Sequence, residues 1–565
     1  MSDTDNIAAL DAAGPDNDVR EKQADILLRL AGGAELFHAP DGTPYADVTD
    51  TGVRRTLPVR GRAFRDWLGL RFYQETGSAP NREAMTAALR VLEAKARYEG
   101  PERPVAVRVA GHGGKIYIDL GTPDWRAVEV DARGWRVVDT PPVRFRRPAG
   151  LKPLPVPVRG GDIRGLRRFL NLRTKEDFIL TLAWLQAALR PEGPYPILAL
   201  TGEQGSAKST FALILRALVD PSQAPLRNLP REDRDAFIAA SNGHVLVFDN
   251  LSGVPPWISD TLCRLATGGG FATRQLYTDQ DEAIFQAARP IILNGIADVV
   301  ARPDLADRAV MLTLEPIPDA KRRPEKALWA DINAALPGLF GGLLDTIAHG
   351  LRALPHVHLT ATPRMADFAH WATACEGAVW APGTFMAAYG AERAASVDSV
   401  IEGDPVASAV RGFMQGREAW EGTATDLLAL LSVQVGETVQ RLPAWPKAPN
   451  ALSGRLTRAA TFLRKAGVEM ATGARAQGRG RARRITLTRR ADNACAPSSA
   501  PSEASERPQT QGPAANDGRT QGRTTVRTTV QEKNMFINAL TDADDADAHI
   551  PALSGARVFR TEATL

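Results

Sequence analysis

The stretch 197–219 constrains the fold more than any other part of this 565-residue chain. An apolar run over 197–200 leads into Gly-Glu-Gln-Gly-Ser-Ala-Lys-Ser-Thr over 202–210, and a helical pattern follows. A strand that delivers a glycine-containing loop to a helix start turns backbone N–H groups and the positive helix end toward one point. Because such a point attracts phosphate oxygens, the pattern predicts an α/β fold with a phosphate-binding loop. The alternative is a chance Gly/Ser loop.

The side chains of this loop suggest how a nucleotide would be held. Lys208 would reach the β- and γ-phosphates, and the hydroxyl of Ser209 would ligate Mg²⁺, so ATP and Mg²⁺ are the predicted cofactors. Ala207 stands where G-x-x-x-x-G-K-[ST] has its last glycine, and we expect alanine to suit a first helical turn there. The predicted nucleotide-binding residues are Gly202, Glu203, Gln204, Gly205, Ser206, Ala207, Lys208, Ser209 and Thr210.

A second apolar run, over 245–248, ends in Asp249. At this distance from a phosphate loop we expect a Walker B carboxylate that holds the Mg²⁺ water shell, although core strands also end in aspartate by chance. Asn250 follows, and its amide can orient a water molecule but cannot accept a proton. Hydrolysis would therefore be slow or would use another carboxylate, such as Glu203 or Asp260.

Two further segments follow in order. Residues 267–285 contain two alternating runs around an acidic turn, which predicts a β-hairpin. The apolar run 290–293 then ends in Asn294, a polar residue suited to sensing the γ-phosphate beside the Mg²⁺ site.

Arg308 precedes the apolar run 309–312. An arginine there could project into a neighbouring subunit's nucleotide as an arginine finger. The alternatives are an ion pair of Arg308 with Asp304 or Asp307 in the same chain, and Arg302 as the finger instead.

The C-terminal stretch 447–490 is strongly basic, with twelve Lys and Arg residues against the single acid Glu469. A helix over 451–466, a strand, a Gly/Arg turn and the strand 485–487 predict a winged-helix-like module that binds DNA. A solvated basic surface or a protein docking module would share this pattern. The predicted DNA contacts here are Arg455, Arg458, Arg464, Arg479, Arg481 and Arg483.

The remaining sequence divides the chain into modules. The proline- and arginine-rich stretch 141–159 indicates a linker, and the stretch before it holds two helices, over 61–76 and 81–98, and a small antiparallel meander. The predicted order is a disordered leader 1–20, an α+β module 21–150, an ATPase core 160–322, a helical connector 323–402 interrupted near Pro337, the basic module 403–490 and a disordered tail 491–565.

Several classes of protein are disfavoured. The N-terminus lacks a signal-peptide pattern, and no apolar stretch approaches the roughly 20 residues that cross a bilayer. The three cysteines are far apart, which disfavours structural zinc. We therefore expect a cytoplasmic protein that does not bind a membrane. Residues 1–150 lack zinc-ligand spacing and a paired-acid metal site, since Asp119 stands alone, so primase activity is not expected on this chain. A separate primase is a candidate partner.

The order of phosphate loop, Walker B strand, hairpin, Asn294 strand and Asp307-Arg308 resembles the superfamily 3 helicases of the phage and plasmid primase-helicase type. The resemblance is close over about 190–320. It implies an AAA+-like parallel-sheet core, a homo-oligomeric ring, usually a hexamer, and single-stranded DNA in a central channel gripped by Arg274 of the hairpin. Ala207, Asn250 and the acidic hairpin tip depart from the family pattern.

These observations together lead to a functional expectation. The chain is expected to be an ATP-dependent DNA helicase or translocase acting in replication of a phage or other mobile element. One alternative is an ATP-switched initiator or loader without processive unwinding, and another is a structural DNA-binding protein with a degenerate loop. The predicted catalytic residues are Lys208, Asp249, Asn250, Asn294 and Arg308, with Ser209 and Asp249 as metal ligands.

Overall fold

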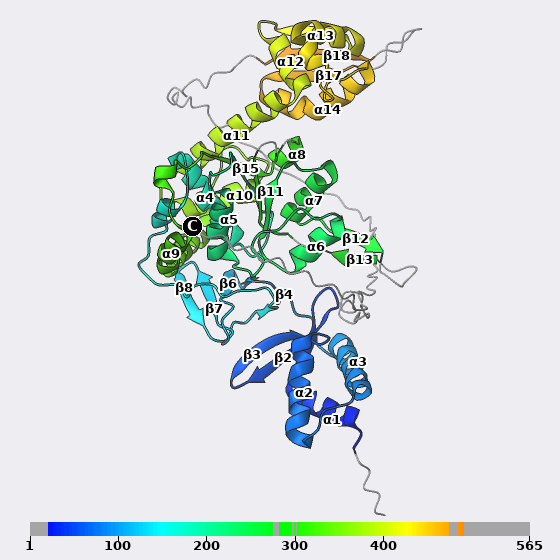
Figure 1. The fold of residues 1–565 in the computed structure, drawn as a ribbon, viewed down its shortest axis with the longest axis vertical. Coiled ribbons are helices and arrows are strands. Elements are labelled where there is room, and N and C mark those ends of the chain that lie inside the picture. Colours follow the sequence, from blue (N-terminus) through cyan, green and yellow to red (C-terminus); the bar gives the residue numbers. More distant parts are fainter. Residues whose placement is uncertain are drawn as a thin grey trace, which may run out of the picture.

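A four-stranded parallel sheet lies at the centre of the computed structural model (Figure 1). The structure describes residues 21–274, 282–285, 288–296, 299–300, 302–473 and 483–490, with the backbone alone at 271–274 and 282–285. The strand order is β11-β14-β10-β15, so the carboxyl ends of all four strands meet at one edge. These strands are β10 (Ile197–Gly202), β11 (Leu246–Leu251), β14 (Ile291–Gly295) and β15 (Ala309–Leu314).

Both faces of this sheet are buried, which explains the continuous apolar runs in the sequence. Leu198 and Leu200 contribute to one core, whereas Ile197 and Ala199 point into the other. The first core is shared with α4 (Lys175–Ala188), α5 (Lys208–Val219), α9 (Glu325–Ala353) and α10 (Ala366–Glu376). The second is shared with α6 (Asp233–Ser241), α7 (Pro256–Thr267) and α8 (Pro303–Ala306).

Helix α9 differs from the expectation of a break near Pro337, because the helix runs through this proline. In the part of the chain that the structure describes, 325–356 is the one helical stretch long and apolar enough to cross a membrane by length and composition. Its side chains Phe340, Leu343 and Ile347 are buried in the first core of the protein. A single helix of this kind, buried by its own fold, is weak evidence for a membrane span.

The N-terminal part forms a unit with a core of its own (Figure 1). An antiparallel sheet of β1 (Glu35–His38), β2 (Pro44–Asp50) and β3 (Val53–Pro58) packs with α1 (Gln23–Leu30), α2 (Arg62–Thr76) and α3 (Arg82–Tyr98). The last two helices match the sequence prediction within one residue. The Asn81 side chain accepts from the Ala84 backbone N–H and so caps the start of α3.

The meander that follows packs differently from our expectation of one module over 21–150. Its strands are β5 (Val109–His112), β6 (Lys115–Asp119), β7 (Ala127–Asp131) and β8 (Gly134–Val138). Ile118, Val128 and Trp135 are buried in the first core of the central body, and Trp135 Nε1 donates to Asp345 of α9 at 2.8 Å. Packing therefore joins the meander to the sheet region, while the N-terminal unit keeps a separate core.

The predicted linker 141–159 is non-helical, as expected, but side chains fix it in place. Arg144 pairs with Asp47 at 2.8 Å, and Arg147 pairs with Asp119 at 2.5 Å. Two residues of this stretch form the short strand β9 (Arg144–Phe145), which pairs with β4 (Val105–Ala106). The segment thus connects the N-terminal unit and the meander through ion pairs.

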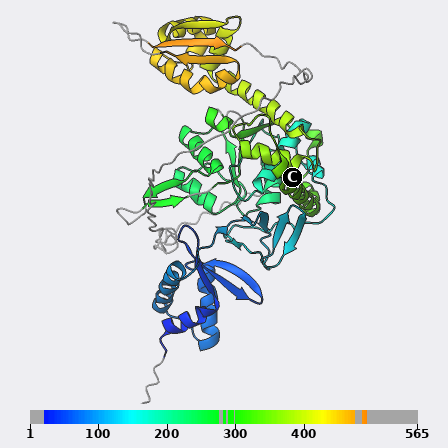
Figure 2. The same ribbon diagram turned by 180° about the vertical axis from the view of Figure 1, so that it is seen from behind.

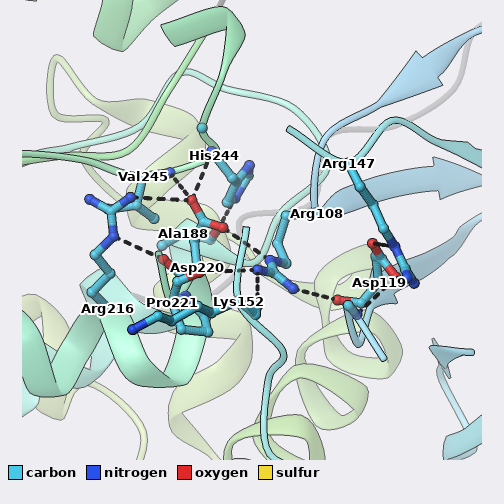
Figure 3. A network of polar contacts seen from close by, with 12 residues as sticks. Arg108, Asp119, Arg147, Lys152, Ala188, Arg216, Asp220, Pro221, His244 and Val245 are labelled. Atoms are coloured by element: carbon cyan, nitrogen blue, oxygen red, sulfur yellow. Dashed lines mark hydrogen bonds and ion pairs between the residues drawn. The ribbon is translucent and has the colours of Figure 1, made fainter. Parts of the chain in front are cut away.

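A buried ionic network joins the meander to the central sheet region (Figure 3). Arg108 is completely buried, and its Nε donates to Asp220 at 3.0 Å. Asp220 follows the last residue of α5 and also accepts from the backbone N–H groups of His244 and Val245. Burial opposes ionisation of Asp220, but Arg108 and Arg216 hold its pKa below the usual aspartate value.

The helix α11 (Thr384–Gly403) leads from the central body to the C-terminal module (Figures 1 and 2). That module consists of α12 (Pro405–Met414), β16 (Ala419–Thr423), α13 (Ala424–Gln440), α14 (Pro449–Lys465), β17 (Val468–Thr472) and β18 (Arg484–Arg489). Its antiparallel sheet has the order β16-β18-β17, and α14 packs beside β17. The predicted helix and the two strands that follow it are therefore present.

Candidate functional site

The loop between β10 and α5 requires glycine at its start. Gly202 has φ +147°, and a Cβ there would lie 2.3 Å from the backbone oxygen of Leu314. Gly205 is left-handed with φ +83°. Ser206 is buried, and its hydroxyl donates to the Glu203 carbonyl at 2.8 Å. The sequence thus encodes a tight turn that brings the backbone back onto the start of α5.

Lys208 is the first residue of α5 and closes this loop. Its Nζ donates to the carbonyl oxygens of Gly202 and Glu203, each at 2.8 Å, and to Ser206 Oγ at 3.3 Å. Burial lowers the pKa of Lys208 from its ordinary value. The ammonium group is therefore held at the helix start, where the backbone dipoles also favour an anion.

Three polar side chains meet beside Lys208 at the carboxyl edge of the sheet. Ser209 Oγ donates to the two carboxylate oxygens of Asp249 at 3.0 and 3.1 Å. Asn294 Nδ2 donates to Asp249 Oδ1 and lies 3.2 Å from Ser209 Oγ. They come together because β14 lies between β10 and β11 in the sheet.

This cluster fits a magnesium ion. Mg²⁺ is held in proteins by one or two oxygen ligands and keeps several waters, and Ser209 and Asp249 supply a hydroxyl and a carboxylate. Asn294 Oδ1 is buried without a hydrogen-bond partner among the described residues, so it is available to a bound water. In the same part of the chain, no group of three or more His, Cys, Asp or Glu side chains could hold a metal.

Asn250 occupies an irregular end of β11. Its φ is +58°, a left-handed conformation that asparagine tolerates better than most residues, and it is exposed. The pairing of β11 with β14 shifts register between Phe248 and Leu251, so Asp249 and Asn250 form a bulge. Bulges of this kind redirect side chains next to active sites.

The two alternative bases predicted from the sequence are placed differently. Glu203 is exposed in the loop. Asp260 pairs with Arg302 at 2.8 Å, and Arg302 also donates to the Pro256 carbonyl. Asp260 and Arg302, the alternative base and the alternative finger, therefore neutralise each other.

Arg308 lies at the opposite edge of the sheet from the loop. Its backbone carbonyl accepts from Ile197 N, the first residue of β10. The six residues of β10 extend over roughly 20 Å. Arg308 therefore cannot reach the loop between β10 and α5 of its own chain.

Arg308 does not form the ion pair with Asp304 or Asp307 that was the alternative to the finger. Its Nη1 donates to the backbone carbonyl of Asp304 at 2.7 Å and lies 3.8 Å from Cys263 Sγ. The carboxylate of Asp307 is buried and binds Lys465 and Arg393, each at 2.5 Å, and Arg364 at 3.4 Å. Since Lys465 ends α14, Asp307 links the loop carrying Arg308 to the C-terminal module.

Ala207 also differs from its prediction. It precedes α5 with φ +61° and ψ +31°, so it is left-handed and not part of a helical turn. A Cβ in this conformation costs about 1–2 kcal/mol. The position thus keeps the backbone shape that a glycine would adopt, at the cost of strain.

We predict that Ala207→Gly stabilises the central body by about 1 kcal/mol, because glycine adopts a left-handed conformation without that cost. The apparent midpoint of thermal unfolding should rise by about 2–4 °C. Ala217→Gly, within the same α5, is the matched control and should lower the midpoint. A lower midpoint for Ala207→Gly would show that the methyl group stabilises the loop.

The predicted DNA contacts are spread over several surfaces. Arg274 ends β12 (Phe271–Arg274), which pairs antiparallel with β13 (Glu282–Phe285) as the predicted hairpin, but its side chain is outside the described residues. Arg479 and Arg481 also lie outside the described residues. Arg458, Arg464 and Arg483 are exposed, whereas Arg455 lies 3.7 Å from Asp404.

Two residues beside the loop were missed by sequence reasoning. Asn171 Nδ2 donates to the carbonyl oxygens of Ser206 at 3.0 Å and Glu315 at 2.7 Å. The guanidinium of Arg322 lies close enough to Gly205 that an added Cβ would be 3.0 Å from its Nη2. No local pattern marks either residue, because their roles arise from chain segments that meet only in the fold.

Comparison with known families identifies the kind of protein. Residues 163–401 match a family model described as actinomycete integrative conjugative element replication protein. Residues 406–504 match a model described as the AICE RepA C-terminal domain. Together the two matches cover about three-fifths of the chain. The chain belongs to the AICE RepA family. The expectation of a mobile-element replication protein is thereby confirmed, and the element is a conjugative one.

Solved structures show only distant likeness. An A-form apo structure of the NrS-1 C-terminal region is 11% identical over 83% of this chain and 98% of its own, with a TM-score of 0.35. A second apo structure of that region has 11% identity, coverages of 83% and 100%, and a TM-score of 0.33. A JCV helicase bound to an acetamide compound is 14% identical over 35% of this chain and 60% of its own, with a TM-score of 0.21. No curated protein matches the sequence.

Proposed function

We propose that this AICE RepA protein is an ATP-dependent DNA helicase or translocase that acts in replication of its conjugative element. The observation that carries the proposal is the meeting of Lys208, Ser209, Asp249 and Asn294 at the carboxyl edge of adjacent parallel strands. A lysine and a helix start recognise phosphates, and the hydroxyl–carboxylate pair suits Mg²⁺. Membership of a replication-protein family supports DNA as the partner.

The proposed chemistry assigns each side chain one task. Lys208 and the loop N–H groups bind and orient the β- and γ-phosphates of ATP. Mg²⁺, when held by Ser209 and Asp249, neutralises charge on the phosphate oxygens. Asn294 and Asn250 orient the attacking water through their amides and do not accept its proton. Because neither amide accepts this proton, we predict a modest basal rate of hydrolysis.

The position of Arg308 favours an assembly of several subunits. Because it lies at the far edge of the sheet from its own loop, it can act on a nucleotide only from a neighbouring chain. The resemblance to superfamily 3 helicases suggests a ring with ATP between subunits. In that arrangement Arg308 of one chain stabilises the transition state at the site of the next.

Mixing two inactive variants tests this arrangement. Lys208→Ala and Arg308→Ala should each lose hydrolysis, the latter by about 10³-fold or more. A 1:1 mixture should regain up to about one quarter of wild-type activity, because a site built from the intact half of each variant is complete. A mixture as inactive as its components would contradict action from a neighbouring chain.

The C-terminal module is the proposed DNA-binding part. Its order of helices and strands, with α14 packed beside a three-stranded antiparallel sheet, supports a winged-helix interpretation. The exposed Arg458 and Arg464 lie on α14, and Lys465 at its end binds Asp307 beside Arg308. This contact is a direct physical route between the DNA-binding module and the proposed finger.

Strand displacement from a forked DNA substrate tests the proposed helicase activity. We expect the wild type to release the labelled strand only with ATP and Mg²⁺, and Lys208→Ala to release none. Hydrolysis of ATP without displacement of any strand would reject the motor and favour the ATP-switched initiator. Asn250 favours this second function, because its amide cannot accept a proton from the attacking water and hydrolysis would then be slow.

A further inference from the structure

We infer that a cleft beside the phosphate loop binds the adenine base of the nucleotide and makes the protein prefer ATP to GTP. This inference rests on the proposed nucleotide binding at Lys208. The cleft has a volume of about 500 Å³, which is within the range of small-molecule sites. Its lining residues are Arg168, Phe169, Arg323, Asp331, Ala334 and Ala335.

Residues next to both walls of the cleft contact the phosphate loop. On one side Asn171, two residues after Phe169, donates to the Ser206 carbonyl at 3.0 Å. On the other side Arg322, next to Arg323, lies over Gly205, and Ile317 N donates to the Gly205 carbonyl. Residues close in sequence to both walls therefore contact the phosphate loop.

The order of strands places the cleft on the correct side of the loop. The Mg²⁺-type cluster with Asp249 and Asn294 lies on β11 and β14, on one side of β10. The wall residues Arg323 and Asp331 follow β15, on the other side of β10. A nucleotide whose γ-phosphate faces Asp249 would therefore extend its base toward the cleft.

The lining suits a flat aromatic ligand. Ala334 and Ala335 of α9 present small apolar side chains in the cleft, and the Arg168 guanidinium stacks 4.6 Å from the centre of the Phe169 ring. Arg168 has no carboxylate partner among the residues described, so the outer face of its guanidinium can stack on a base. Such a surface binds a planar ring without selecting which one.

Selection would come from the pair Arg323 and Asp331. Their side chains are 2.5 Å apart and about half exposed, so they present a donor beside an acceptor to the cleft. Adenine offers an acceptor, N7, beside a donor, its amino group, whereas guanine offers two acceptors, N7 and O6. The pair therefore matches adenine and leaves Asp331 facing an oxygen of guanine.

Titration calorimetry with Mg²⁺ and ATP, GTP or inorganic tripolyphosphate tests this inference on the full chain. The wild type should bind ATP about fivefold or more tightly than GTP, and more tightly than tripolyphosphate. Asp331→Ala should remove the preference over GTP. Ala334→Trp places a large side chain in the cleft from an exposed position. It should lower the affinity for ATP to that for tripolyphosphate, and the affinity for tripolyphosphate should not change.

Asn333→Trp is the matched control, since residue 333 is exposed on α9 but does not line the cleft. Unchanged ATP affinity and preference in Asp331→Ala and Ala334→Trp would overturn the inference, even with tripolyphosphate still bound. If the wild type binds neither tripolyphosphate nor ATP, the phosphate site itself is rejected. The two failures are therefore distinguishable.

Discussion

Lys208→Ala should lower ATP hydrolysis by about 10²- to 10³-fold, because it removes the positive charge aimed at the phosphates. In the structure the Lys208 ammonium is held by two loop carbonyls and Ser206, all within 3.3 Å, so its position is set before any nucleotide arrives. Alanine is a good helix former and should keep α5 intact. Release of inorganic phosphate at saturating ATP measures the effect.

The exposed Lys326 provides a control for the loss of a lysine side chain. Lys326→Ala should hydrolyse ATP at the wild-type rate. An unfolding midpoint of Lys208→Ala close to that of the wild type would show that the loss concerns chemistry and not folding. A well-folded Lys208→Ala protein that hydrolyses ATP at the wild-type rate would contradict the proposed role of this loop in ATP hydrolysis.

Arg108→Met should destabilise the central body by about 3–5 kcal/mol, because it leaves the carboxylate of Asp220 buried without its main partner. Figure 3 shows Arg108 reaching from the meander to Asp220, while its other nitrogens donate to the Asp119 and Lys152 carbonyls. Methionine fills much of the volume but replaces none of these bonds. The apparent midpoint of thermal unfolding, followed by circular dichroism, should fall clearly.

Arg133→Met is the control for loss of an arginine, since Arg133 is 87% exposed and pairs with Asp131 at the surface. Arg133→Met should change the free energy of unfolding by less than about 1 kcal/mol. Adding Asp220→Asn to Arg108→Met should recover part of the stability, because the amide oxygen still accepts hydrogen bonds but the buried charge is gone. An unchanged midpoint for Arg108→Met would mean that the network does not hold the meander in place.

The parts of the fold that were predicted from the sequence depend on local patterns. The apolar run before Gly202, the run ending in Asp249 and the strand ending in Asn294 are continuous because both faces of their sheet are buried. The hairpin before Phe285 follows from alternation and an intervening turn. These patterns show each segment separately, and the sheet order then brings the loop after Gly202 together with Asp249 and Asn294.

The parts that sequence reasoning missed depend on contacts between distant segments. Arg108 and Asp220 are 112 residues apart, so no local pattern could assign the meander to the central body. Asn171 supports the loop from 35 residues upstream of Ser206. The left-handed conformation of Ala207 was also missed, because alanine at that position reads as the first residue of a helix.

The rate of ATP hydrolysis by the purified chain, measured as single-stranded DNA is added, tests whether the protein is a DNA-dependent motor. We predict a low basal rate that rises several-fold with DNA, and a rate about 10²- to 10³-fold lower in Lys208→Ala. A rate that DNA leaves unchanged would contradict a DNA-dependent motor, even if the protein binds both ATP and DNA.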